Sequence, residues 1–199
     1  RHIQDDDVRR LKGALGVPLN LEMSIAEEIV QAALAIKPAQ VTLVPERRQE
    51  LTTEGGLDVA RLLPQLRPLI IRFHEAGIHV SLFVDPDSKQ LDASREAGAR
   101  IVELHTGRYA HAASGAPRER EVSALRQAAE RAVSLRLAVA AGHGLDYDNI
   151  HPVAAMRQIE EVNIGFSIIS RAVFVGLEQA VREMLSHLAV SHSHAASNA

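Results

Sequence analysis

The sequence predicts a parallel α/β domain built from six consecutive strand–helix units. Short runs rich in aliphatic and β-branched residues alternate with longer segments that have helical spacing. Several of the short runs are almost continuously apolar, which is typical of strands covered on both faces. The joints also repeat, because residues 75–78 and 96–99 each end a helix at Gly and lead into a strand. Parallel strands joined by right-handed helical crossovers account for all three observations.

The first two helices have clear local signals. The charged residues 5–15 predict the first helix, and a capping box of Ser24 and Glu27 starts the second, which ends before Pro38. Strands are expected where apolar residues cluster, at residues 19–23, 40–44, 79–84, 100–104, 136–140 and 161–164.

The later helices are predicted in the same way. The third is expected to start near Pro68, since Pro64 and Pro68 suit only a first helical turn, and to end at Ala76. Asp87 is expected to cap the fourth helix. Apolar stripes predict further helices over residues 118–135 and 177–188.

Two architectures fit six such units. A doubly wound open sheet accommodates six strands directly, whereas a closed (β/α)8 barrel needs eight. The chain begins with Arg1 rather than Met, so we expect that about two N-terminal units are lacking, which would restore the ~250 residues typical of a barrel. The expectation is one partial barrel domain over residues 1–191 and a disordered tail over residues 192–199.

Composition excludes several classes of protein. Aromatic residues make up 3% of the chain and the net charge is −3, so there are few stacking platforms and no general basic field for nucleic acid. The absence of Cys excludes disulfides, thiol nucleophiles and iron–sulfur clusters. No apolar run approaches the roughly 18 residues of a membrane span. We expect a cytoplasmic protein with neither nucleic-acid nor membrane partners.

Polar side chains gather where the predicted strands end. In both architectures ligands bind at the carboxyl ends of the strands, so these groups should converge on one site. The groups are Glu22, residues 45–48, Asp85, the Glu103–Leu104–His105–Thr106 run, residues 141–144 and residues 163–165.

Three of these residues are candidates for catalysis. Glu22 lies between Leu21 and Met23 in a predicted buried strand, and a buried charge is more often functional than decorative. His143 lies between two glycines, which leave its imidazole open to the site. Glu103 points the same way as His105, and an ion pair with a core Arg is an equally good explanation of its position.

Glycines at the last two strand ends indicate a phosphate site. If two units precede the chain, these strands are the seventh and eighth of a barrel, whose following loops commonly hold phosphate together with a helix N-terminus. Gly144 and Gly165 fall in those loops. No metal is expected, because the spacing of His111, His151, His192 and His194 matches no zinc-binding pattern.

Seven motifs, taken in chain order, are similar to those of one family. They are NLEM at 20–23, LVPE at 43–46, LTTEGGLDV at 51–59, VSLF at 80–83, ELHTG at 103–107, AGHGL at 141–145 and NIG at 163–165. Together they closely resemble the pyridoxine 5′-phosphate synthase family, the ring-closing enzymes of deoxyxylulose-dependent vitamin B6 synthesis. The resemblance runs from Arg1 to about Leu188.

The resemblance implies a (β/α)8 barrel that condenses 3-amino-2-oxopropyl phosphate with 1-deoxy-D-xylulose 5-phosphate, without a cofactor. The products are pyridoxine 5′-phosphate, inorganic phosphate and water, and family members form homo-oligomers. Glu22 matches a general base, His143 a general acid and Glu103 a carboxylate that stabilises a cationic transition state. The matching substrate contacts are His2 and Thr52 for the deoxyxylulose phosphate, and Gly144, Gly165 and the position of Phe166 for the amino-ketone phosphate.

The chain departs from the family pattern at three places. The family's first strand, with an Asn, an Asp-His pair and an Arg, and its second strand, with another catalytic His, are absent. Phe166 stands where the family usually has His, and Ala140 where it usually has Asn.

Two other interpretations remain open from the residues alone. One is another phosphate-binding barrel enzyme, although a Schiff-base aldolase needs a strand-end Lys and the lysines here lie on predicted helices. The other is a fragment that folds without activity.

Overall fold

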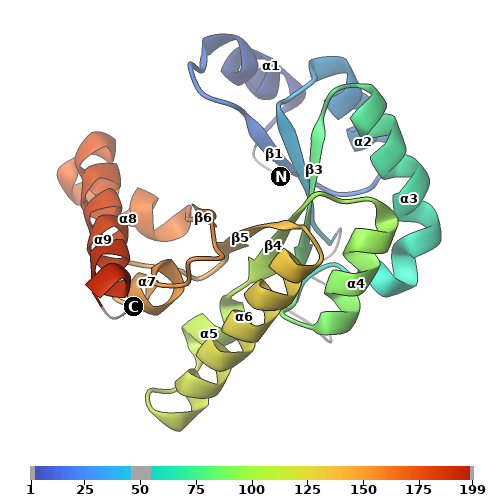
Figure 1. The fold of residues 1–199 in the computed structure, drawn as a ribbon. Helices are drawn as coiled ribbons and strands as arrows, with labels where there is room; N and C mark the ends of the chain where they lie inside the picture. Colours follow the sequence, from blue (N-terminus) through green and yellow to red (C-terminus); the bar gives the residue numbers. More distant parts are fainter. Residues whose placement is uncertain (1–2, 46–54, 198–199) are drawn as a thin grey trace.

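The structure is a computed structural model that describes residues 3–45 and 55–197, with the backbone alone from residue 190 onward. Strands and helices alternate along the chain as the sequence predicts (Figure 1). The elements are α1 (Asp5–Ala14), β1 (Asn20–Met23), α2 (Glu27–Ile36), β2 (Gln40–Leu43), α3 (Val59–Glu75), β3 (His79–Val84), α4 (Ser88–Ala97), β4 (Ile101–His105), α5 (Gly107–His111), α6 (Ala116–Ser134), β5 (Ala138–Gly142), α7 (Ile150–Ala154), β6 (Glu161–Asn163), α8 (Phe166–Val175) and α9 (Leu177–Ser197).

The six strands form one curled parallel sheet in the order β1-β2-β3-β4-β5-β6. Each strand pairs only with its neighbours in the chain, and among the described residues β1 and β6 are the edges. Helices α2, α3, α4 and α6 cover one face, whereas α7, α8 and α9 lie together beyond β6 (Figure 1). The sheet is therefore a half-barrel rather than a doubly wound sheet with helices on both faces.

The hydrophobic core lies between the sheet and the helices that cover it. Alternate strand residues such as Val41, Leu82 and Leu104 point outward and are completely buried against helical residues such as Phe73 and Leu125. The inner face is more polar. It carries Asn20, Glu22, Thr42, Ser81, Glu103 and Asn163.

Helix α3 begins nine residues before the expected start at Pro68, so that prediction was wrong. Asp58 caps the helix by accepting a hydrogen bond from the Arg61 amide, and Pro64 and Pro68 both lie on its exposed side. The buried residues of the helix, including Phe73, hold it against the core, which outweighs the backbone hydrogen bonds that two prolines cannot make.

The expected capping box at Ser24 is also wrong. Helix α2 starts at Glu27 with Ala26 as its N-cap residue, and the Ser24 hydroxyl instead accepts a hydrogen bond from the Ala26 amide in the preceding turn. By contrast, Asp87 caps α4 as predicted, because its carboxylate accepts from the Lys89 amide at 3.0 Å.

Two further boundaries differ from the sequence prediction. Strand β5 starts at Ala138 rather than at 136, since Arg136 takes a left-handed conformation (φ 60°) in the turn that leaves α6. Helix α9 includes residues 192–197, for which a disordered tail was expected. Within the described residues, no helix has both the length and the apolar character to cross a bilayer.

Candidate functional site

The predicted catalytic residues lie along the inner face and the carboxyl end of the sheet. Glu22 is on the edge strand β1, Glu103 on the central strand β4, and His143 directly follows β5. Glu22 is exposed rather than buried, because no strand covers the inner side of β1 in the described structure. His2 and Thr52 lie outside the described residues.

Glu103 is the buried carboxyl group of the site, with only 3% of its surface exposed. Its Oε2 accepts a hydrogen bond of 2.8 Å from Asn163 Nδ2 of β6, so its partner is an amide and not the core Arg that was the alternative. Burial, followed by the negative charge of Glu22, raises the pKa of Glu103 to about 7, although the Asn163 bond opposes the shift. A carboxyl group of this kind can hold or release a proton near neutral pH.

Gly142 makes room for this carboxyl group. It lies beside Glu103 on the neighbouring strand, and a Cβ atom there would collide with Glu103 Oε1. A side chain at this position would force Glu103 out of its place, which explains why the strand ends with glycine.

His105 is held by a carboxylate at the end of the neighbouring strand. Its Nδ1 lies 2.9 Å from Asp85 Oδ1, and the same oxygen accepts a hydrogen bond of 3.1 Å from the Gly56 amide. These contacts, the His105 bond first, lower the pKa of Asp85 although burial opposes the shift. His105 is 3% exposed, so its ring is fixed in the protein interior.

His143 meets His105 at the mouth of the half-barrel. The two rings lie edge to face with centroids 5.0 Å apart, and Phe83 contacts both, at 5.1 Å from His105 and 6.4 Å from His143. His143 itself is exposed, as expected for a group that must reach a substrate.

The backbone at His143 has an uncommon conformation. Its φ is 84°, in the left-handed region that a residue with a side chain rarely adopts. The Thr106 hydroxyl lies 2.7 Å from the carbonyl oxygens of both Gly142 and His143, and the Thr106 amide also donates to Gly142 at 2.9 Å. Thr106 therefore clamps the turn that presents the imidazole.

The predicted phosphate cradle lies beside this turn. Gly144 follows His143, and its carbonyl oxygen accepts a hydrogen bond from Asn149 Nδ2. The Ser167 hydroxyl, in the first turn of α8, donates to the Leu145 carbonyl at 2.9 Å, which joins the loop to the helix that Gly165 precedes. The structure thus brings the loop of Gly144 and the N-terminus of α8 together.

Phe166 is the first residue of α8 and is 89% exposed. Its amide belongs to the helix N-terminus, whereas its ring contributes little to the core.

Three residues of the site had no predicted role of their own. Asp85 and Asn163 were expected only to follow strands, and His105 only to point the same way as Glu103. A polar residue directly after an almost wholly apolar strand, as at Asp85, is the signal that would have assigned it to the site.

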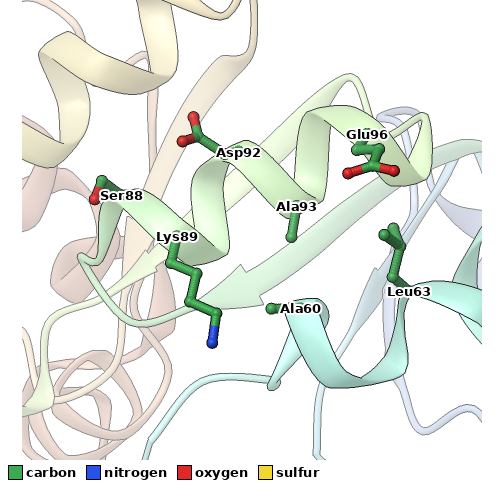
Figure 2. Close-up of a pocket in the computed structure, with 7 residues that line it drawn as sticks. All are labelled: Ala60, Leu63, Ser88, Lys89, Asp92, Ala93 and Glu96. Atoms are coloured by element: carbon green, nitrogen blue, oxygen red, sulfur yellow. The ribbon is translucent and has the colours of Figure 1, made fainter.

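A hollow of about 440 Å³ lies on the outer layer between α3 and α4 (Figure 2). Both of its carboxylates already have partners, since Asp92 pairs with Arg131 at 2.6 Å and Glu96 with Arg67 at 3.1 Å. This hollow is on the opposite side of the sheet from the inner face and is not part of the site. Among the side chains of residues 3–45 and 55–189, no group of three or more His, Asp or Glu could hold a metal ion.

Solved structures support the barrel-type fold. A KDPGal structure matches with a TM-score of 0.61 at 13% identity, covering 98% of this chain and 79% of that one. A tryptophan synthase α-subunit from Pyrococcus furiosus matches with a TM-score of 0.60 at 15% identity, covering 92% of this chain and 72% of that one. At such identities the similarity concerns the fold alone.

Sequence comparisons are more specific. The family described as "Pyridoxal phosphate biosynthesis protein PdxJ" matches residues 1–190. A protein named pyridoxine 5′-phosphate synthase from Synechococcus sp. is 56% identical over 96% of this chain and 80% of its own length. One of the same name from Coxiella burnetii is 52% identical over 95% of this chain and 79% of its own length. The chain therefore belongs to the family of the pyridoxal phosphate biosynthesis protein PdxJ.

Proposed function

We propose that this chain is a pyridoxine 5′-phosphate synthase, which condenses 3-amino-2-oxopropyl phosphate with 1-deoxy-D-xylulose 5-phosphate. The observation that carries the proposal is the set of relatives at 52–56% identity with that name. The site agrees in its chemistry, because carboxyl and imidazole groups converge at one end of a parallel sheet. Imine formation, dehydration and ring closure are successive proton transfers, which such groups can perform.

In this proposal Glu22 is the general base and His143 the general acid. Glu22 is exposed on the inner side of β1, where it can remove a proton from a bound substrate. Glu103 stabilises the cationic transition state. Its raised pKa supports this role, because a cationic intermediate beside it would favour the ionised carboxylate, and the two charges would then attract each other.

The amino-ketone phosphate is proposed to bind between the loop of Gly144 and the start of α8. Backbone amides at Gly144, Gly165 and Phe166 would donate to its oxygens, and the partial positive charge of the helix N-terminus would add to the attraction. His2 and Thr52 are proposed to contact the deoxyxylulose phosphate. The exchange of the family's usual His for Phe166 removes a side-chain contact but leaves the amide in place.

We further propose that two more strand–helix units are needed to close the barrel. The edges of β1 and β6 are unpaired within the described residues, and the chain spans about 80% of the length of the Synechococcus relative. In this proposal the two units precede β1 and supply an Asp-His pair and another catalytic His. The closed barrel would form a homo-oligomer of cytoplasmic location.

The test is product formation from the two substrates, measured by chromatography with fluorescence detection of pyridoxine 5′-phosphate. It compares the 199-residue chain with a form carrying the two N-terminal units of the Synechococcus relative. In the active form, Glu22→Gln and His143→Gln should each lower kcat by about 10²–10⁴ without loss of stability, as is typical of a general base or acid.

Glu28→Gln provides the matched control, because Glu28 is an exposed carboxylate on α2 outside the site. It should leave kcat unchanged. Activity of the extended form alone would identify the short chain as an inactive fragment, whereas inactivity of both forms would refute the proposed function. Rates within threefold of the parent for Glu22→Gln would refute the role of that residue.

A further inference from the structure

Asp85 and His105 form a hydrogen-bonded pair that the proposed chemistry does not use. We propose that they are positioning residues for His143: Asp85 anchors the His105 ring, and the anchored ring fixes and electrostatically supports the His143 imidazole. The inference rests on the proposed function only where it treats His143 as the general acid.

The hydrogen-bonding pattern fixes how His105 is held. An ionised carboxylate only accepts hydrogen bonds, so His105 Nδ1 carries a hydrogen and donates it to Asp85 Oδ1 over 2.9 Å. The amide of Gly56 donates to the same oxygen, which keeps the carboxylate in place. Because His105 Nδ1 is engaged in this way, the imidazole has one orientation and one tautomer in its neutral form, as in other carboxylate–histidine pairs.

The other edge of the His105 ring faces the turn of His143. A Cβ atom on Gly107 would come within 2.5 Å of His105 Nε2 and within 3.0 Å of His143 Cδ2. Gly107 therefore lies against both rings and leaves the space in which they meet. With their centroids 5.0 Å apart, movement of the buried His105 would also displace His143.

The pair also places a negative charge behind the general acid. The Asp85 carboxylate is bonded to His105, whose ring centroid lies 5.0 Å from that of His143, so its charge favours a protonated His143 over a neutral one. The titratable or charged groups on the packed elements include His105 itself, Glu103 of β4, His111 of α5 and Arg108 of α5, whose charge acts on Asp85. None of these groups is changed when Asp85 is replaced.

The experiment measures the titration of His143 directly, without substrate. Diethyl pyrocarbonate reacts with neutral imidazole, and peptide mass spectrometry as a function of pH gives a midpoint for each His. Asp85→Asn keeps both hydrogen bonds at the same oxygen and removes only the charge. It should lower the His143 midpoint by about half a pH unit, the scale of one charge acting over such a distance.

Asp87→Asn is the matched control, since it removes the same charge from an exposed residue two positions along, and Asn also caps helices well. It should leave the His143 midpoint unchanged. Asp85→Ser removes the charge as well and provides a second variant if the first does not fold. An unchanged His143 midpoint in a folded Asp85 variant, or equal shifts with Asp87→Asn, would overturn the proposal.

Kinetics on the active form then test the role of the ring. His105→Asn can still donate to Asp85 but has no ring to contact His143, so kcat should fall about tenfold while KM stays within twofold. A change confined to KM would contradict a positioning role. If the parent has no synthase activity, the proposed function fails, while the modification experiment still decides whether Asp85 acts on His143.

Discussion

Glu103 combines burial, a like-charged neighbour and a single amide donor. Burial and the nearby charge of Glu22 favour its neutral form, and the one hydrogen bond from Asn163 is too little to reverse them. Its position within a strand could be predicted from the sequence, because it follows the alternation of inner and outer residues. Its partner could not, since Asn163 lies 60 positions away and only the curvature of the sheet brings the two together.

The raised pKa of Glu103 should make stability depend on pH. The unfolded chain releases this proton near pH 4.5 and the folded chain near 7, so stability due to the protonated group is complete below pH 4.5 and is lost as the pH rises to 7. The loss should be about 3 kcal/mol by linkage. Urea unfolding of the parent and Glu103→Gln at several pH values measures it.

The variant should lack this part of the pH dependence, because Gln does not ionise. Glu160→Gln, which changes an exposed carboxylate directly before β6, should retain it. Parallel stability curves for the parent and Glu103→Gln between pH 4.5 and 7 would contradict the assignment.

At the scale of elements, the turn after β5 depends on Thr106. The Thr106 hydroxyl lies within hydrogen-bonding distance of two carbonyl oxygens, and the Thr106 amide donates to one of them. Thr106, which directly follows β4, therefore supports the left-handed backbone at His143. A left-handed residue with a side chain costs about 1–2 kcal/mol and persists only where neighbours hold it.

We predict that Thr106→Val, which keeps the shape but lacks the hydroxyl, destabilises the protein by about 1–3 kcal/mol, because the single hydroxyl hydrogen that the carbonyl oxygens of Gly142 and His143 share is lost. Thermal and urea unfolding measure the change. Thr106→Ser, which keeps the hydroxyl, should retain most of the stability of the parent. If Thr106→Val were as stable as the parent and Thr106→Ser less stable, the methyl group rather than the hydroxyl would be the important part of Thr106.

The elements also show where sequence patterns succeed. Asp87 was assigned correctly as a cap because the signal is local, whereas the start of α3 was missed because tertiary packing overrides proline. The left-handed turn at Arg136 moves the start of β5 two residues past its predicted position. It could not be predicted from the sequence, because no glycine occupies the turn.

At the scale of the whole molecule, the edge of the sheet and α8 expose surfaces that barrels cover. Helix α8 contains no buried side chain, and Val173 and Phe174 are 79% and 84% exposed. An apolar surface of this kind, beside unpaired strand edges, favours association. The parallel α/β class could be predicted from the alternation of strands and helices, but this alternation fits a doubly wound sheet and a barrel equally well. The choice between them, and the extent of this open side, depend on the curvature of the sheet, which no local pattern encodes.

The 199-residue chain should therefore associate in solution, and supplying about 50 residues ahead of residue 1, enough for two barrel units, should give a monodisperse protein. Light scattering on both forms at equal concentration is the measurement. A monodisperse short chain would show that α8 and the edges of the sheet do not drive association.

Because every strand pairs only with its neighbours in the chain, the sheet is a linear array of units whose ends are the least protected. Amide hydrogen exchange should be slowest in β3 and β4 and fastest in β1 and β6. Both ends of this array contribute residues to the site, Glu22 from β1 and Asn163 from β6. A ligand that binds across the inner face should then slow exchange most in the two outermost strands, so that substrate binding acts as the closing element of an unclosed sheet.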